Sequence, residues 1–378
     1  MINIKGKACN AFCYADDIDE ATYLDIQAIC DNQSIKNQKI CIMPDAHTNR
    51  DGSVTGFTME LGDAIILCTE KDAGCGVRAV KLNIHKEDID FEKLDKICHE
   101  IPAGNNQAYF EPAFPYDFTS LRCYQGIKQF VIWPRLLGTL GGGNHFIELN
   151  EGNHVDLYLV IHNGLEHYSR PMIDYYKNVA AKNINKTLEE CSPFDLLLQG
   201  KDKEDYLHDM TFFVELCKRN REYISDYIID KMGWRGIEVI DCCHHYTSIA
   251  DNIVRHGAIS AQKGEKVIIP INSKEGSILG IGKGNPDWNY SAPHGGGRKF
   301  TRRKARETYS LEDYQESLKG IYTTSVCESN LDEIAYSYRD MDTIKKAIKD
   351  TVEVTDIIKP IYLYRGSNNR RFEMPKLK

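Results

Sequence analysis

A glycine-rich segment, residues 137–148 (LGTLGGGNHFIE), places the tightest constraint on how this chain can fold. Glycine lets a backbone take positive φ angles and approach a ligand closely, so four glycines here indicate a tight turn. An amide, an imidazole and a carboxylate follow at Asn144, His145 and Glu148, and they can supply hydrogen bonds and a metal ligand. The segment predicts a binding loop; the alternative is an ordinary turn before a strand over residues 146–149.

The composition is that of a globular protein, with 378 residues, 42% hydrophobic and 27% charged. No apolar run is long enough to span a bilayer, and the first residues lack the pattern of a signal peptide. We therefore expect a cytoplasmic protein. Thirteen cysteines without a secretion signal favour free thiols, and the absence of any Cys-x-x-Cys pair argues against a zinc ribbon.

The charge pattern excludes a protein that binds nucleic acid through overall basicity, because the net charge is −8 and the pI about 5.9. A local basic run exists at residues 298–306 (RKFTRRKAR), where six of nine side chains are cationic. Such a run is usually a solvated face. This one directly follows His294 and three glycines, so it could also bind phosphate groups.

The chain is predicted to be a single domain, residues 1–378, because no repeat, low-complexity tract or linker divides it. Runs rich in Val, Ile and Leu predict strands over residues 65–69, 77–84, 157–162, 266–271 and 277–281. Helices are expected over residues 21–31, 202–232, 311–319 and 340–350, with Ser310 as the N-cap of the third. The mixture predicts an α+β fold.

Several candidate metal ligands stand at the ends of predicted strands or in glycine-broken loops. Asp72 lies three residues before Cys75, and a thiolate there could bridge two metal ions. His145 follows the glycine run, His162 ends an apolar strand, and His244 or its neighbour follows another apolar run. A lone cysteine or histidine is more often a buried structural residue. Taken together, the N, O and S donors suit Mn²⁺, Fe²⁺ or Zn²⁺.

His294 begins a second unusual segment, His294-Gly295-Gly296-Gly297-Arg298. The glycines are expected to leave the imidazole uncrowded and the backbone N–H groups free to meet phosphate. Histidine can serve as a covalent nucleophile. The alternative is a flexible loop with an incidental histidine.

In this order, the segments resemble the RtcB family of RNA-splicing ligases. The matching segments are Met43-Pro44-Asp45-Ala46-His47, Asp72-x-x-Cys75-Gly76-Val77-Arg78, Gly138-Thr139-Leu140-Gly141-x-Gly143-Asn144-His145-x-x-Glu148, Ile161-His162-x-Gly164, His244, His294-Gly295-x-Gly297-Arg298 and Thr301-Arg302. Weaker matches are Tyr206-Leu207-x-Asp209-Met210, Asn220-Arg221 and Ala335-Tyr336…Asp340-Met341-Asp342. The matches extend from about residue 43 to residue 366, and the strings around Asn144 and Cys75 are the specific ones.

The resemblance implies an α+β domain with a mixed or antiparallel β core flanked by helices. It also implies a ligase, dependent on GTP and two Mn²⁺ ions, that joins an RNA 3′-phosphate or 2′,3′-cyclic phosphate to a 5′-hydroxyl. The family's roles fall on these residues: metal binding by Asp72, Cys75, His145, His162 and His244; GMP attachment to His294; guanylate binding by Asn144, Glu148, Ser277, Gly296 and Arg365; and RNA binding by Arg298 and Arg302.

The sequence departs from the family pattern at four places. Residues 270–277 (PINSKEGS) keep only the final serine of the family's Pro-Gly-Ser-Met-Gly-Thr-x-Ser, and Pro293 replaces a cysteine. Residues 165–167 (LEH) stand where the family has Ser-Arg-Gly, and Arg365 replaces a closing lysine. Two other functions therefore stay open: a metal-dependent RNA-end phosphodiesterase and a non-catalytic RNA-binding protein.

Overall fold

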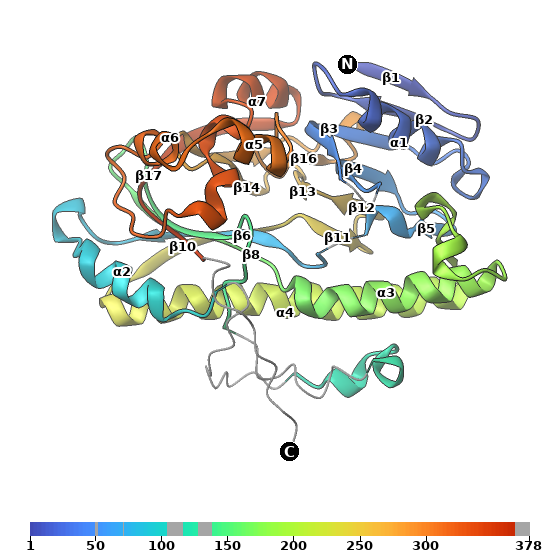
Figure 1. Cartoon of the computed structure of the whole chain (residues 1–378), viewed down its shortest axis with the longest axis horizontal. Helices are drawn as coiled ribbons and strands as arrows, with labels where there is room; N and C mark the ends of the chain where they lie inside the picture. Colours follow the sequence, from blue (N-terminus) through green and yellow to red (C-terminus); the bar gives the residue numbers. More distant parts are fainter. Residues whose placement is uncertain (50–51, 71, 104–115, 128–137, 367–378) are drawn as a thin grey trace.

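Seven strands form the larger sheet, in the order β10-β6-β8-β7-β17-β15-β14, and every neighbouring pair is antiparallel. The computed structural model describes residues 1–49, 52–70, 72–103, 116–127 and 138–366 (Figure 1). The strands are β6 (Gly76–Leu82), β7 (Phe146–Glu151), β8 (Leu157–Asn163), β10 (Gly236–Cys243), β14 (Lys266–Asn272), β15 (Gly276–Gly282) and β17 (Val352–Arg365). The sheet curls until its two edge strands meet, and there Lys266 Nζ of β14 donates to Glu238 of β10 at 2.6 Å.

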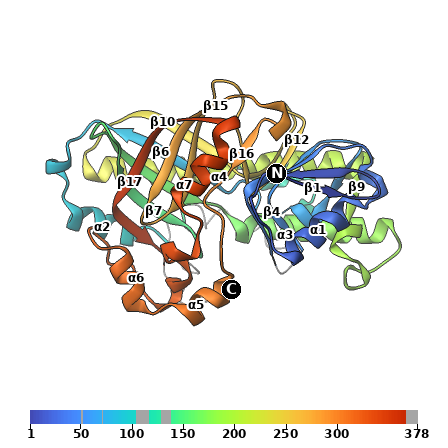
Figure 2. The same cartoon turned by 90° about the horizontal axis from the view of Figure 1, so that it is seen from above.

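A second sheet of six strands lies beside the first, in the order β1-β2-β3-β4-β12-β11 (Figure 2). It is mixed, because β2 and β3 are parallel and the other neighbours are antiparallel. Its strands are β1 (Ile2–Lys5), β2 (Asn10–Cys13), β3 (Ile40–Thr48), β4 (Val54–Glu60), β11 (His245–Ser248) and β12 (Ile253–His256). Two small antiparallel pairs complete the β structure: β5 (Ala64–Ile66) with β9 (Leu197–Gln199), and β13 (Ala258–Ser260) with β16 (Ser291–Pro293).

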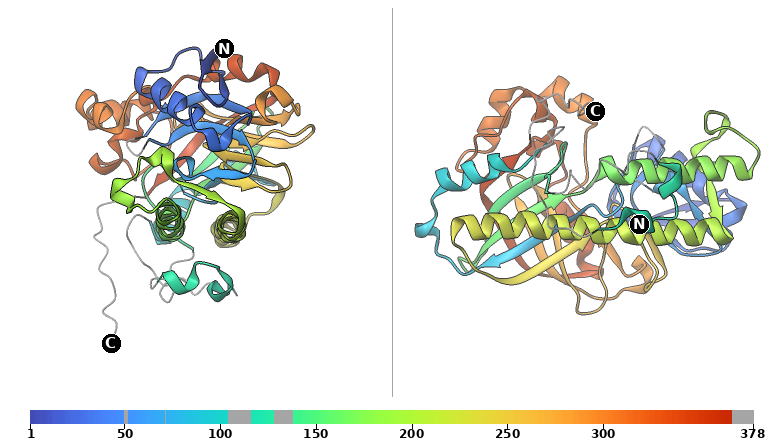
Figure 3. Two further views of the ribbon diagram at one scale, coloured as in Figure 1. Left: turned by 90° about the vertical axis from the view of Figure 1, so that its right-hand side faces the viewer. Right: turned by 90° about the horizontal axis from the view of Figure 1, so that it is seen from below.

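Two long helices, α3 (Glu166–Asn183) and α4 (Gly200–Met232), run side by side beneath the strands (Figures 1 and 3). One face of α4 is apolar and buried, and it includes Phe213, Leu216 and Ile224. Gly233 ends this helix with φ +74°, a conformation that glycine adopts without strain. The shorter helices are α1 (Glu20–Cys30), α2 (Phe91–Glu100), α5 (Arg302–Thr308), α6 (Leu311–Ser317) and α7 (Met341–Ala347).

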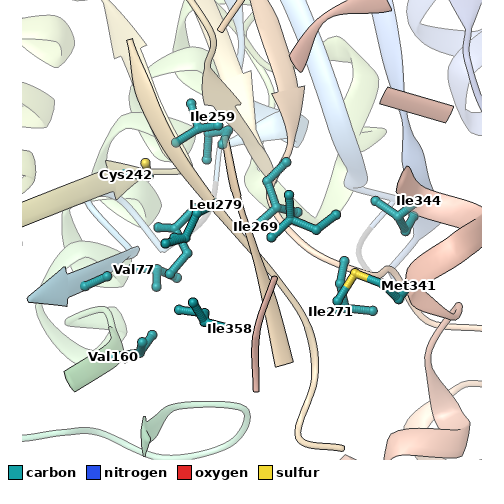
Figure 4. Close-up of a cluster of buried hydrophobic side chains, with 14 of the residues drawn as sticks. Val77, Val160, Cys242, Ile259, Ile269, Ile271, Leu279, Met341, Ile344 and Ile358 are labelled. Carbon is teal, nitrogen blue, oxygen red and sulfur yellow. The ribbon is translucent and has the colours of Figure 1, made fainter. Parts of the chain in front are cut away.

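The largest hydrophobic cluster fills the inside of the curled sheet (Figure 4). Ile269 of β14, Leu279 of β15 and Ile358 of β17 meet there at 0–5% exposure, and Ile344 closes the cluster from α7. Burying each such side chain stabilises the fold by roughly 1.5–3 kcal/mol. This core fixes the strands whose ends carry the candidate site.

The α+β prediction with a mixed or antiparallel core is confirmed. The strands expected at residues 77–84, 157–162, 266–271 and 277–281 and the helix expected at 202–232 form close to these bounds. Ser310 caps α6, as predicted, by accepting from the Asp313 N–H. Two elements are shorter than expected, because β5 ends at Ile66, where a 3-10 turn begins, and α6 ends at Ser317. In the last predicted helix, α7 ends at Ala347 and a 3-10 helix continues to Asp350. Residue 137 of the glycine-rich segment lies outside the described residues.

No disulfide joins any of the thirteen cysteines, all of which lie in the described residues, in agreement with the expectation from the missing secretion signal. Within the described ranges, the structure contains no helix with the length and apolar character needed to cross a membrane.

Candidate active site

Four of the predicted metal ligands lie at one end of the seven-stranded sheet, although they are far apart in sequence. β6 and β7 begin at this end, directly after Cys75 and His145. β8 and β10 end there, with His162 as the penultimate residue of β8 and His244 just after β10. The antiparallel register joins these ends, because His162 pairs with Phe146, the first residue of β7, and the last residue of β10 pairs with the first of β6.

The Cys75 thiol lies at the centre of these side chains. Its Sγ is 3.4 Å from His162 Nε2 and 3.6 Å from His145 Nε2. One ligand atom each of Cys75, His162 and His244 lies within 4.8 Å of the others, which is close enough for all three to bind one ion. His145 contacts this trio through the Cys75 thiol. Asp72 opens the loop with φ +47°, and its carbonyl accepts from the Cys75 N–H at 2.9 Å.

The imidazoles of the donor set have the neutral state that favours a cation, whereas the thiol must lose its proton when an ion binds. Burial lowers the pKa of His145 to about 4 and the pKa values of His162 and His244 well below the ordinary value, so these imidazoles are neutral near pH 7. Burial also raises the pKa of the Cys75 thiol, and the Asp72 carboxylate adds to the rise. His244 Nδ1 is buried and has no hydrogen-bond partner among the described residues. A metal ion would satisfy such a nitrogen, so the residues fit a metal site.

The orientation of His162 follows from its backbone contact. Its Nδ1 lies 3.3 Å from the Asn144 carbonyl, which can only accept a hydrogen bond, so Nδ1 carries the proton. The lone pair is then on Nε2, which faces Cys75. The glycine-rich segment thus sets the tautomer of a ligand on the neighbouring strand.

His294 lies at the side of this cluster and is held by a buried carboxylate. Its ring centroid is 4.9 Å from that of His244. Asp45 of β3 is fully buried, and its Oδ2 accepts from His294 Nδ1 at 2.6 Å and from the His294 backbone N–H at 3.2 Å. The contact with Asp45 is made by Nδ1, so the other ring nitrogen of His294, Nε2, does not take part in it. Asp45 falls in a segment that matches the family, but the sequence alone gave it no role. Its position directly after the apolar run of residues 40–44 could have identified it.

The glycines after His294 differ from the open loop that the sequence predicted. The Gly296 N–H donates to the Pro270 carbonyl at 3.1 Å, so the expectation that it is free for phosphate is wrong. A Cβ at Gly296 would lie 2.6 Å from the Ile271 carbonyl oxygen. The residue is glycine because two backbones pack against each other here, and Ser277 lies opposite Pro270 in the same region.

Glu148 and Arg365 occupy the other side of the ligand cluster, on the paired strands β7 and β17. Arg365 NH1 donates to the Asn144 carbonyl at 3.1 Å, and its guanidinium lies over the Phe146 ring. Burial raises the pKa of Glu148 to about 7, although Arg365 opposes the rise. Three predicted guanylate residues, Asn144, Glu148 and Arg365, are therefore brought together, while Ser277 and Gly296 lie beside β14.

The basic run is tied to two buried carboxylates. Arg298 NH2 pairs with Glu333 at 2.6 Å, and Arg302 NH1 pairs with Asp332 at 2.7 Å and also with Glu333. Arg306 pairs with Asp332, and Arg365 NH1 is 3.6 Å from Glu333. Burial would raise the pKa of Glu333, but Arg298, Arg302 and Arg365 hold it well below its ordinary value. Four arginines meet two carboxylates, so the cluster keeps an excess of positive charge.

Comparisons with known proteins agree with this site. The family model described as tRNA-splicing ligase RtcB matches residues 127–366, which is more than half of the chain. The chain is similar to RNA-splicing ligase RtcB of Escherichia coli (strain K12). The two are 26% identical over an alignment of 379 residues, gaps included, which covers 86% of this chain and 90% of the relative. It is also similar to tRNA-splicing ligase RtcB of Aeropyrum pernix, with 22% identity over 91% of this chain and 92% of the relative. The motifs, the clustered side chains and the family match together establish that the chain belongs to the RtcB family.

Proposed function

We propose that this protein is a GTP- and Mn²⁺-dependent RNA ligase that joins RNA 3′-phosphate or 2′,3′-cyclic phosphate ends to 5′-hydroxyl ends, in RNA repair or tRNA splicing. Relatives named RNA-splicing and tRNA-splicing ligases support RNA ligation. The observation that carries the proposal is His294, whose Nδ1 is held by the buried Asp45 beside the Cys75, His162 and His244 cluster.

His294 is the proposed nucleophile. Asp45 accepts a hydrogen bond from His294 Nδ1–H, so the lone pair is on Nε2. This is the atom that would form a P–N bond to the α-phosphorus of GTP while pyrophosphate leaves. The GMP group would then pass from His294 to the RNA 3′-phosphate. Attack of the 5′-hydroxyl on that activated phosphate would join the strands and release GMP.

Cys75, His145, His162 and His244, with Asp72 beside them, would hold the two Mn²⁺ ions. Cys75 is the candidate bridging ligand because its Sγ contacts imidazoles on two sides. Bound metal would supply positive charge to the phosphate oxygens during phosphoryl transfer. Asn144, Glu148, Ser277 and Arg365 are the proposed guanylate-binding residues, together with Gly296, whose N–H is already bound to the Pro270 carbonyl and which would contact the nucleotide through its other backbone atoms.

Arg298 and Arg302 are the proposed RNA-binding residues. Arg302 is the more available of the two, because half of its side chain is exposed whereas Arg298 is largely buried. The excess positive charge of their cluster favours a phosphate ligand even though each arginine is paired.

Incubation of the protein with α-labelled GTP and Mn²⁺ tests the proposed function. A ligase of this kind should become covalently labelled, and unlabelled RNA with a 3′-phosphate should remove the label and be joined to a 5′-hydroxyl strand. Hydrolysis of RNA ends without protein labelling would instead support the phosphodiesterase. RNA binding without either reaction would support the non-catalytic protein.

Replacing Asp45 with asparagine should slow protein labelling by roughly 100-fold or more, because an amide no longer fixes the proton on His294 Nδ1. The rate of adduct formation measures the effect. Asp156→Asn is a suitable control, since Asp156 pairs with Lys81 at the opposite end of β8. Equal labelling rates in wild type and Asp45→Asn would exclude this role for the carboxylate.

Replacing Arg365 with alanine should weaken GTP binding by roughly 1.5–3 kcal/mol if its hydrogen bond to the base is charge-assisted. Its Nε is buried without a hydrogen-bond partner in the described part of the chain, so a donor is available to a purine acceptor. GTP and ATP affinities measured by calorimetry give the size and the base dependence of the loss, and we expect the wild type to prefer GTP. An unchanged GTP affinity would place the guanine contact elsewhere.

A further inference from the structure

Asn220 and Arg221, on one turn of α4, have no part in the proposed reaction, yet they contact the segments that carry the candidate metal ligands. Their exposed fractions are 0% and 1%. α4 crosses beneath the sheet end where the candidate ligands gather, so a single turn of helix can reach several strands and loops at once.

Arg221 binds three ligand-bearing segments. Its NH1 donates to the carbonyls of Gly74, which precedes Cys75, at 2.8 Å and of Asn163, which follows His162, at 3.2 Å. Its NH2 and Nε donate to the carboxylate of Asp241, which lies on β10 shortly before His244, at 2.7–3.3 Å.

The guanidinium group fits because residue 76 is glycine. A Cβ at Gly76 would lie 2.9 Å from Arg221 Cζ and 2.6 Å from the Cys242 carbonyl oxygen. The close approach shows that the planar group is packed between β6 and the helix, so its direction is fixed.

Asn220 binds the fourth segment, which leads to His145. Its Oδ1 accepts from the Gly138 N–H at 2.6 Å, and its Nδ2 donates to the Thr139 carbonyl at 2.9 Å. The same Nδ2 donates to Asn163 Oδ1 at 2.7 Å, so the glycine-rich segment and the end of β8 are joined through one amide.

We propose that Asn220 and Arg221 are positioning residues that hold the four ligand-bearing segments in the geometry required for metal binding. The proposal rests on the metal-binding part of the proposed function. The residue types suit this role, because arginine presents its donors in a rigid fork that can bind two carbonyls and a carboxylate together, which the single ammonium of lysine cannot do. Groups that orient metal ligands in this way usually contribute 10–100-fold to metal affinity.

Arg78 provides a matched control. It is also buried, with 9% of its side chain exposed, and it also binds Asp241, at 3.5 Å. Its other hydrogen bond goes to Ser225 of α4 at 3.1 Å, and neither bond reaches a carbonyl beside Cys75, His145 or His162. Arg78→Lys should therefore perturb the same buried carboxylate without releasing those loops.

Calorimetric titration of the metal-free full chain with Mn²⁺, without GTP or RNA, tests the proposal. Arg221→Lys should bind Mn²⁺ about 10–100-fold more weakly than wild type, while Arg78→Lys binds within about threefold of it. The melting temperature of each metal-free variant separates loss of metal geometry from loss of the fold. Asn220→Asp, which keeps the acceptor for Gly138 and loses the donor to Thr139, should also weaken binding and serves as the test if Arg221→Lys does not fold.

Three results would overturn the inference: wild-type affinity in a folded Arg221→Lys or Asn220→Asp variant, an equal loss in Arg78→Lys, or a wild type that binds no divalent ion. The last result would also remove the metal site. Intact Mn²⁺ binding in a wild type that is never labelled by GTP would overturn the proposed function alone.

Discussion

A His294→Ala variant is expected to form no labelled protein–GMP adduct and to join no RNA ends. The variant lacks the Nε2 lone pair that Asp45 leaves available in the wild type. Its Mn²⁺ content should stay unchanged, because Cys75, His162 and His244 form a complete trio without His294. Labelling with α-labelled GTP, followed by acid treatment that cleaves a P–N bond, measures the first result, and metal analysis measures the second.

His154→Ala is the control for this experiment, since His154 is exposed in the turn that joins the end of β7 to the start of β8, away from the sheet end that carries the cluster. Adduct that persists in His294→Ala would place the nucleophile on another side chain. Loss of both adduct and bound Mn²⁺ would instead make His294 a metal ligand.

A Cys75→Ala variant is expected to lose Mn²⁺ binding by more than about 100-fold, beyond the range seen when only a supporting group is removed. Its Sγ is the atom that contacts both His145 and His162, so no other side chain replaces it. Cys217→Ala is the matched control, because that thiol is also buried and lies close to the same loop, where it donates to the Ala73 carbonyl. Equal affinity in the two variants would contradict a metal role for Cys75.

The same titration has a pH signature. Burial lowers the pKa values of the three imidazoles, so they are already neutral near pH 7, whereas it raises the pKa of Cys75, so the thiol is protonated before the ion binds. Binding must then release about one proton, which comes from the thiol, and affinity should rise with pH. Calorimetry in two buffers with different ionisation enthalpies measures the released proton. Release of two or more protons would show that an imidazole is charged in the metal-free protein.

The sequence indicated two of the candidate ligands, His162 and His244, because each stands at the end of an apolar run. Such a run forms a strand, and the end of a strand is where a polar side chain leaves the core. Cys75 and His145 stand instead in glycine-containing segments before strands, and the complete candidate set came from the family resemblance. These residues come together only because the strands are ordered β10-β6-β8-β7 in the sheet. The positions and lengths of the apolar runs in the sequence do not determine that order.

Contacts between segments that are far apart in the chain could not be predicted from the sequence. Asp45 binds His294 across 249 positions, and Asp332 and Glu333 neutralise part of a basic run about 30 residues before them. Neither the Asp45–His294 contact nor the contacts of Asp332 and Glu333 with the basic run have a sequence separation that the period of a helix or strand would reveal. The same limit explains why residues 298–306 could be interpreted as a solvated face or a phosphate-binding segment, but not as the partner of two buried carboxylates.

The position of β17 has a consequence for how the protein is made. This strand lies between β7 and β15, so it joins the half of the sheet with Cys75 and His162 to the half with Ser277. It is also the last strand among the described residues, so synthesis from the N-terminus delivers it after the other strands described. Until then each half exposes an unpaired edge, and such edges are where nascent chains aggregate. A chain that stops before residue 352 therefore lacks the strand that joins β7 to β15, and it also lacks the Arg365 side chain that binds the Asn144 carbonyl.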